Sequence, residues 1–295
     1  MNFKEILDAR TEEVFRVIET YLPPVEGYQS TVLSAMDYSV RAGGKRLRPM
    51  LMEETYRLFG GKGKEIEPFM AAIEMIHTSS LIHDDLPCMD NDTLRRGLPT
   101  AWVKFGYDMA VLAGDGLLMY AMETAAKALS MTDRPDLTAR CMGILAGKTG
   151  VYGMIGGQTV DVELSGKPVS KEQLDFIYRL KTGALLEASM VIGAILGGAD
   201  EKEINLVEKM ASSIGLAFQI QDDILDMTSN EEVLGKPVLS DEKNHKTTYV
   251  TLEGMNKARQ DVERISEEAV SCLHELPGKN EFLEELIRML VNREK

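Results

Sequence analysis

The chain has 295 residues, and its 33 Lys and Arg against 47 Asp and Glu give a formal net charge of −14. Proteins that bind nucleic acid usually carry a basic stripe, so this charge and a pI near 4.9 argue against that class. The apolar share of 44% is enough to build a buried core, which argues against a disordered chain.

The sequence predicts neither export nor a membrane span. The first ten residues, MNFKEILDAR, mix both charges and lack the apolar core of a secretory signal. The longest clearly apolar stretch, residues 190–199, is about half of the roughly 20 residues that a spanning helix needs. Cys88, Cys141 and Cys272 form no C-x-x-C pair, as is typical of thiols in a reducing compartment. We therefore expect a cytoplasmic protein.

Helical periodicity runs through the sequence. Residues 3–21 place apolar side chains at three- and four-residue spacings, which predicts an amphipathic helix that Pro23 and Pro24 end. The same pattern predicts helices over 29–42, 46–59, 66–85, 107–129, 134–148, 171–197, 202–227, 256–275 and 280–292. No segment alternates with a period of two, so the predicted fold is all-α. No linker or tandem repeat is visible, and we expect residues 1–295 to form one large helical domain whose helices surround something.

The sequence holds two aspartate clusters, one of the form DD-x4-D and one of the form DD-x-x-D, each at the end of an apolar helix. They consist of Asp84, Asp85 and Asp90, and of Asp222, Asp223 and Asp226. The residue before Pro87 is pushed out of helical geometry, and Thr228 follows the second cluster closely. Carboxylates at the negative end of a helix dipole repel one another and need a cation.

Oxygen ligands without a His or Cys cluster favour a hard ion, and Mg²⁺ is the leading candidate. A solvated charged turn is the alternative for one such cluster, and the occurrence of two makes it less attractive. The spacing of an EF-hand calcium loop is absent.

Basic residues at several places could bind phosphate groups. Lys45 and Arg48 follow a Gly-Gly turn and are expected on one helix face, and Arg95 and Arg96 follow the first aspartate cluster. Lys181 lies in an otherwise apolar helix, where a lysine is costly without an anionic partner. The remaining cations, in the loop after the second cluster, are Lys236 and Lys246. Any one of them could instead be a plain surface cation.

Two further side chains share a helix face with an aspartate. His77 precedes Asp84 by seven residues, and Gln219 precedes Asp222 by three. A core histidine and a structural hydrogen-bonding glutamine are the alternatives.

Taken together, these residues resemble the trans-prenyl diphosphate synthase (polyprenyl synthetase) family over essentially the whole chain. The resemblance is carried, in family order, by GGKRLRP (43–49), HTSSLIHDDLPCMDNDTLRRG (77–97), KTG (181–183), FQIQDDILD (218–226) and the loop with Lys236 and Lys246. It implies a bundle of mostly antiparallel helices around a substrate cavity, the isoprenoid synthase fold, and a homodimer. It also implies a prenyltransferase that uses Mg²⁺ to ionise an allylic diphosphate and joins it to isopentenyl diphosphate, without a nucleic-acid partner.

The resemblance also assigns roles to residues. As Mg²⁺ ligands it implies Asp84, Asp90 and Asp222, with Asp85, Asp223 and Asp226 in support. For the allylic diphosphate it implies Arg95, Lys181, Thr182, Gln219, Lys236 and Lys246; for isopentenyl diphosphate it implies Lys45, Arg48, His77 and Arg96. Three positions depart from the family pattern: His245 and Val250 replace a usual Gly and Pro, and Thr93 replaces a frequent aspartate.

Product length is expected to depend on the helix before the first cluster. Five residues upstream of Asp84, about 7.5 Å along a helix, farnesyl-forming relatives often carry an aromatic ring, whereas this chain has Ser79 followed by Ser80. The next bulky candidates are Met75 and Ile76. The expected product is geranylgeranyl diphosphate (C20), with farnesyl diphosphate (C15) as the alternative.

Two other classes of function remain as alternatives. A non-catalytic subunit of a heteromeric synthase tends to lose one of the motifs, and here all are intact. A terpene cyclase also ionises diphosphates but needs no isopentenyl site, and the GGKRLRP segment argues against it.

Overall fold

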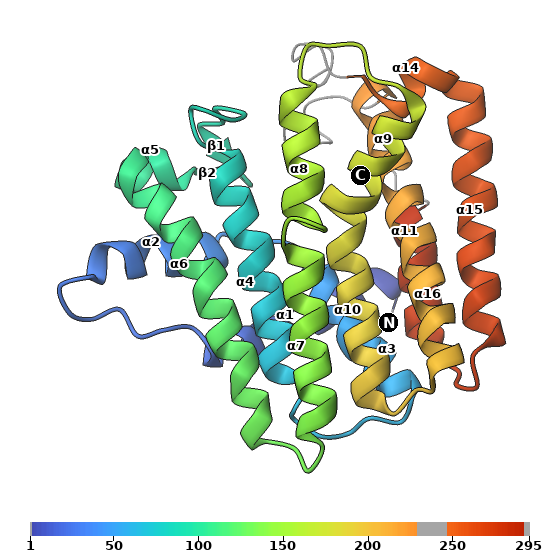
Figure 1. The fold of residues 1–295 in the computed structure, drawn as a ribbon, viewed down its shortest axis with the longest axis horizontal. Helices are drawn as coiled ribbons and strands as arrows, with labels where there is room; N and C mark the ends of the chain where they lie inside the picture. The colour runs from blue at the N-terminus through green and yellow to red at the C-terminus, as the bar shows by residue number, and fades with distance from the viewer. Residues whose placement is uncertain (1, 229–246, 292–295) are drawn as a thin grey trace. The chain divides into compact units, whose positions relative to one another are not determined.

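The computed structural model describes residues 2–228 and 247–291, which are almost entirely helical (Figure 1). The first half of the chain contains α1 (Phe3–Thr20), α2 (Ser30–Arg41), α3 (Leu47–Leu58), α4 (Glu67–Asp84), β1 (Leu94–Arg95), β2 (Leu98–Pro99), α5 (Ala101–Phe105), α6 (Tyr107–Ala126), the 3₁₀ turn η1 (Lys127–Ser130) and α7 (Pro135–Thr149). The second half contains α8 (Met154–Glu163), α9 (Lys171–Ile177), the π-helical turn η2 (Tyr178–Gly183), α10 (Ala184–Gly197), α11 (Glu201–Thr228), α14 (Tyr249–Glu253), α15 (Met255–Glu275) and α16 (Glu281–Val291). The predicted all-α fold is confirmed.

The chain divides into two compact units, one of Met1–Glu53 with Gly63–Met142 and the other of Glu54–Lys62 with Gly143–Lys295. The expectation of a single domain over 1–295 stays a prediction.

In the first unit, α4 packs along α6 and also contacts α1 and α2. The stretch from Pro68 to Ile76 is buried on every side, as expected for a core helix without an amphipathic face. α6 meets it with small residues such as Ala110, Ala113 and Gly114. At Gly114 an added Cβ would lie 2.1 Å from His83 Nε2, so this glycine allows the end of α4 that carries the first aspartates to rest on α6.

In the second unit, α11 packs between α10 and α15, and α8 packs against η2 (Figure 1). A core cluster beneath the second aspartates includes Tyr178, Ile220, Ile224, Tyr249 and Ile265. This cluster holds the aspartate-bearing end of α11 against η2, α14 and α15.

The continuous helix predicted over 171–197 is interrupted at Tyr178–Gly183 by the π-helical turn η2. The segment Lys171–Gly197 is nevertheless long and apolar enough, by length and composition, to cross a membrane. In the structure 72% of its most apolar window is buried inside the protein, which is the pattern of a core helix.

Three short helices were not predicted, namely α5, α8 and α14. Helix α8 was not predicted because Gly156 and Gly157 have low helical propensity. The structure explains Gly157: a Cβ there would lie 2.3 Å from the backbone nitrogen of Lys181, so only glycine lets α8 come this close to η2.

Candidate active site

The first aspartate cluster folds back on itself at the end of α4. The helix ends at Asp84, and the amide of Asp90 donates a hydrogen bond of 2.9 Å to the Asp84 carbonyl oxygen. Asn91, with a positive φ of 54°, closes the turn by donating its amide to the Leu86 carbonyl oxygen at 3.1 Å. The spacer of four residues therefore brings Asp84, half-buried, and Asp90, exposed, to the same end of the helix.

Asp85 points inward and is 3% exposed, and its carboxylate binds Arg95. Arg95 Nε lies 2.8 Å from Oδ1 and 2.9 Å from Oδ2 of Asp85. Arg95 belongs to the hairpin β1–β2, whose open end is braced because the Asp92 carbonyl oxygen accepts hydrogen bonds from Thr100 Oγ1 and Trp102 Nε1, each at 2.8 Å. The side chain predicted to bind phosphate is thus held next to the aspartate pair.

A group of basic side chains lies in the same unit. Arg95 and Arg96 line a small cavity of about 30 Å³ together with Asp85 and Thr78. Arg96 has a positive φ of 54°, and its guanidinium donates a hydrogen bond to the Gly43 carbonyl oxygen. A Cβ on Gly44 would lie 2.7 Å from Arg96 Cζ, so the Gly-Gly turn forms the surface on which this guanidinium rests.

These basic side chains lie close together and have too few negative charges around them to balance their own. Burial lowers the pKa of Arg48 to about 10, with Glu74 opposing and Arg96 adding to the decrease. Burial, followed by the positive charges of Arg48 and Arg96, also lowers the pKa of His77 well below its usual value of 6.5. The Nε atom of Arg48 is buried without a hydrogen-bond partner among the described residues. An anion would relieve each of these penalties.

Arg46 sits among these cations but has a structural role that the sequence did not reveal. It is 4% exposed, and its Nη1 lies 2.6 Å from Glu74 Oε1, while its Cζ lies 4.9 Å from the centre of the Phe15 ring. Lys45, in contrast, is exposed and precedes the first residue of α3. The expectation that Lys45 and Arg48 share one helix face is therefore wrong.

The second aspartate cluster occupies the last turns of α11. Asp222 is half-buried, whereas Asp223 and Asp226 are 3% and 4% exposed. Of the three carboxylates, that of Asp222 is the most open to a ligand.

Lys181 has the anionic partner that was expected for it, and this partner is the side chain of Asp161. Its Nζ lies 2.6 Å from Asp161 Oδ2, and both side chains are partly exposed. Asp161 lies on α8, four residues after Gly157 and therefore on the face that meets η2. Neighbouring Thr182 donates its hydroxyl to Gln219 Oε1 at 2.8 Å.

These side chains surround a cavity of about 100 Å³ within the second unit. Most of its polar lining comes from Asp161, Lys181, Thr182, Gln219, Asp223, Thr247 and Thr248. Leu164, Val169, Leu174 and Ile177 form its apolar wall. The predicted residues Lys181, Thr182, Gln219 and Asp223 thus line one cavity.

Residues 2–228 and 247–291 contain no group of three or more His, Cys, Asp or Glu side chains arranged to hold a metal ion. Mg²⁺ commonly binds through one or two carboxylates and completes its shell with water and substrate phosphates. The accessible oxygen donors, Asp84 and Asp90 at the end of α4 and Asp222 near the end of α11, fit that mode of binding.

Some predicted residues are placed without a visible role, and others are not described. Met75 and Ile76 are fully buried and Ser79 is 3% exposed, while Ser80 is half-buried. Ser79 and Ser80 donate their hydroxyls to the carbonyl oxygens of Ile76 and His77, each at 2.8 Å. Lys236 and Lys246 lie outside the described residues.

The chain is similar to known proteins over most of its length. The polyprenyl synthetase family profile matches residues 29–287. Farnesyl diphosphate synthase of Geobacillus stearothermophilus is 43% identical over 260 residues, which is 88% of this chain and 87% of that protein. A chloroplastic geranylgeranyl pyrophosphate synthase of Catharanthus roseus is 45% identical over 278 residues, which is 93% of this chain and 76% of that protein.

Solved structures extend the similarity to the fold. An FPP/GFPP synthase from Zymomonas mobilis superposes with a TM-score of 0.86 at 34% identity, covering 98% of this chain and 99% of that one. A geranyltransferase from Helicobacter pylori, complexed with magnesium and isoprenyl diphosphate, gives a TM-score of 0.84 at 31% identity, covering 99% and 97%. The chain therefore belongs to the polyprenyl synthetase family, and it is a prenyltransferase of the short-chain prenyl diphosphate synthase class.

Proposed function

We propose that the enzyme joins isopentenyl diphosphate to an allylic diphosphate, which is dimethylallyl, geranyl or farnesyl diphosphate, and releases diphosphate. The observation that carries the proposal is the group Arg48, His77 and Arg96. Burial and nearby positive charges lower the pKa of each, so an added anion would stabilise the charged form of the group. The neighbouring Arg95, in contrast, is paired with Asp85. A second anion site is what distinguishes a condensing synthase from an enzyme that only ionises one diphosphate.

The two substrates are assigned to separate residues. Isopentenyl diphosphate binds Lys45, Arg48, His77 and Arg96. The allylic diphosphate binds Arg95, Lys181, Thr182, Gln219, Lys236 and Lys246, and its Mg²⁺ ligands are Asp84, Asp90 and Asp222, with Asp85, Asp223 and Asp226 in support. That both aspartate clusters serve one diphosphate rests on the sequence resemblance.

The chemistry follows from these charges. Arg95 and Lys181 stabilise the negative charge that develops as the carbon–oxygen bond breaks and its electron pair leaves with diphosphate. Mg²⁺ supplies further charge stabilisation to the leaving group when bound. The double bond of isopentenyl diphosphate then supplies the electron pair of the new carbon–carbon bond, and a proton is lost to the released diphosphate. No side chain of the protein is needed as the base.

The proposed product is geranylgeranyl diphosphate, with farnesyl diphosphate as the second candidate. Ser79, five residues before Asp84 on α4, is a small residue and places no aromatic ring at this position. Relatives bear both product names at nearly equal identity, 43% and 45%, so similarity alone does not separate the two products.

One assay tests both parts of the proposal. Purified enzyme is given an allylic diphosphate with and without labelled isopentenyl diphosphate, and the released diphosphate and product lengths are measured. Diphosphate release that does not depend on isopentenyl diphosphate contradicts the synthase, and a pure C15 product contradicts the C20 assignment. Ser79→Tyr should shorten the product, whereas Ser130→Tyr, which adds the same ring at an exposed position, should leave it unchanged.

We also propose a homodimer located in the cytoplasm. α6 exposes Leu112 and Met119, which are 50% and 68% accessible and seven residues apart on one face, as suits a surface covered by a second copy. Cys88, Cys141 and Cys272 are all free thiols, which fits a reducing compartment. Sedimentation analysis of the protein and of Met119→Glu, which should dissociate, tests the dimer.

A further inference from the structure

Groups of the protein already bind the carboxylate of Asp223. The residue is 3% exposed, and its Oδ2 accepts one hydrogen bond from the Tyr178 hydroxyl and another, of 2.7 Å, from the Tyr249 amide. The Tyr249 amide also lies 3.2 Å from Tyr178 Oη, which closes a triangle of polar groups. One carboxylate oxygen thus joins α11, η2 and α14.

The contact between Asp223 and Tyr178 belongs to a regular seam between η2 and α11. Tyr178 pairs with Asp223, and Thr182, four residues later, pairs with Gln219, four residues earlier. Gly183 and Gly215 continue the seam, since a Cβ on Gly215 would lie 2.9 Å from Gly183 Cα. Lys181 lies between the two hydrogen-bonded pairs, so the seam sets the position of its backbone.

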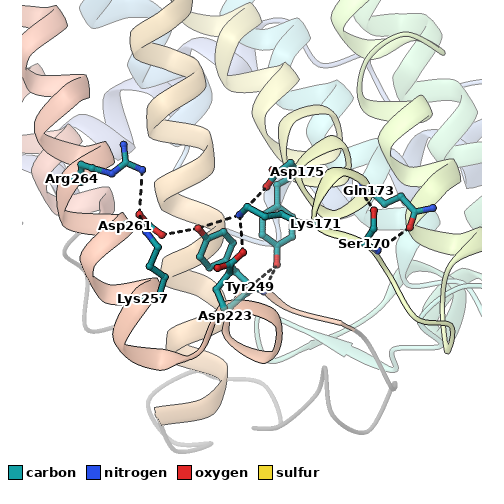
Figure 2. Close-up of polar contacts among 11 residues, drawn as sticks. Ser170, Lys171, Gln173, Asp175, Asp223, Tyr249, Lys257, Asp261 and Arg264 are labelled. Carbon is teal, nitrogen blue, oxygen red and sulfur yellow. Dashed lines mark hydrogen bonds and ion pairs between the residues drawn. The ribbon is translucent and has the colours of Figure 1, made fainter.

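Tyr249 is fixed at its other end as well. Its hydroxyl donates a hydrogen bond of 2.7 Å to Asp261 Oδ2, and Lys171 Nζ lies 4.5 Å from the centre of its ring (Figure 2). Asp261 is held in turn by Lys257 at 2.7 Å and Arg264 at 3.2 Å (Figure 2). Because Thr247 and Thr248 line the cavity directly before Tyr249, the anchoring of Tyr249 fixes that part of the lining.

We propose that Asp223 is a positioning residue rather than a metal ligand: through Tyr178 and Tyr249 it holds Lys181 and Thr248 in place around the cavity beside Asp222. A carboxylate that turned toward Mg²⁺ would take the acceptor away from two buried donors. The inference rests on the proposed function, because the cavity is the proposed diphosphate site. It divides the DD pair into Asp222, which faces the ligand, and Asp223, which organises the walls.

Substituting asparagine for Asp223 separates the two roles. The amide oxygen of Asp223→Asn can accept both hydrogen bonds from the position of Oδ2, but the side chain has lost the charge that a metal ligand needs. Asp223→Ala removes the acceptor altogether. We expect kcat to fall about 100-fold in Asp223→Ala and to be at least tenfold higher in Asp223→Asn than in Asp223→Ala. The Mg²⁺ concentration for half-maximal rate should shift in Asp222→Asn and not in Asp223→Asn.

The partner supplies a second test. Tyr178→Phe removes only the hydroxyl, and its effect on kcat should not add to that of Asp223→Ala in a double-mutant cycle. Tyr28→Phe, which removes a fully exposed hydroxyl, is the matched control and should not change the rate. Additive effects of Tyr178→Phe and Asp223→Ala would overturn the proposal, as would an Asp223→Asn variant as impaired as Asp223→Ala with the same Mg²⁺ shift as Asp222→Asn.

A measurement without substrate or metal separates this inference from the proposed function. Hydrogen exchange at the Tyr249 amide should be slow in the wild type and in Asp223→Asn and at least tenfold faster in Asp223→Ala. Equal exchange in all three proteins overturns the positioning role. Absence of turnover in the wild type would instead overturn the proposed function, while the exchange rates would still decide the role of Asp223.

Discussion

The guanidinium of Arg95 binds the carboxylate of Asp85 through two nitrogens: Nε lies 2.8 and 2.9 Å from the two oxygens, and Nη2 lies 2.5 Å from Oδ1. Although burial opposes the charge, the hydrogen bonds to Asp85 hold the pKa of Arg95 above its usual value. Arg95 therefore stays charged, and the negative charges of Asp92 and Asp84 support that charge further.

Arg95→Lys is expected to lower kcat/KM for the allylic diphosphate about 10- to 100-fold. A lysine keeps the charge but cannot bind Asp85 at two points and a phosphate oxygen as well, and a hydrogen bond to a charged group contributes about 1.5–3 kcal/mol. Steady-state kinetics with each substrate varied in turn measures the effect. Arg134→Lys is the control, because Arg134 pairs with Asp136 at an exposed position, and it should leave both constants unchanged. A change confined to isopentenyl diphosphate would contradict the assignment of Arg95.

Glu74→Ala is expected to destabilise the protein by about 3–5 kcal/mol, because it leaves the buried Arg46 guanidinium without its counter-charge. Both side chains of this pair are 2% exposed, and 2.6 Å separate Arg46 Nη1 from Glu74 Oε1. Urea unfolding gives the free energy of unfolding. Removing the acid of a surface pair, by Glu12→Ala next to Arg16, should cost less than about 1 kcal/mol. Equal losses of unfolding free energy in the two variants would show that the buried pair stabilises the protein no more than a surface pair does.

Gly44→Ala is expected to raise the KM for isopentenyl diphosphate more than tenfold. The new Cβ would lie 2.7 Å from Arg96 Cζ, so the guanidinium must move. Gly43→Ala is a matched control in the same turn: its φ of +95° is also strained for alanine, at about 1–2 kcal/mol, but no atom lies within 4 Å of the added Cβ. A KM raised equally in both variants would assign the effect to the backbone and not to Arg96.

His77 is expected to make the protein sensitive to acid. Its pKa is lowered in the folded state, so below about pH 6.5 the unfolded chain binds the proton first and stability falls as the pH falls toward the folded pKa. His77→Gln should remove up to about 1.4 kcal/mol of this loss per pH unit. Free energies of unfolding at pH 7, 6 and 5 measure the slope. Identical slopes in the two proteins would mean that His77 titrates normally in the folded state.

The sequence predicted most long helices to within a few residues, because apolar side chains recur with a helical period over whole segments. It predicted the outer boundaries of 171–197 well but not the π-helical turn within, since a single widened turn leaves the periodicity on either side intact. The short helix α8 was missed because Gly156 and Gly157 are poor helix formers, although Gly157 is required for the approach to Lys181.

The residue types of the site could be predicted from the sequence better than the ion pairs that they form. The sequence indicated that Lys181 needs an anionic partner, but Asp161 lies 20 residues earlier on the unpredicted α8, and no spacing rule connects the two. Likewise, Arg46 and Arg48 are alike in the sequence, and only the fold shows that Glu74 pairs with Arg46. Local spacing identifies residues that share a face, whereas partners distant in the sequence depend on tertiary packing.

The π-helical turn of Tyr178–Gly183 makes the number of residues in this segment as important as their identity. A π turn holds more residues than an α turn, so deleting one residue here would rotate everything after it by about 100°. The helix that follows, α10, is buried from Ala184 to Ile195, and such a rotation would present the wrong side chains to every neighbour. We therefore expect the spacing between Tyr178 and Gly183 to tolerate substitutions far better than insertions or deletions.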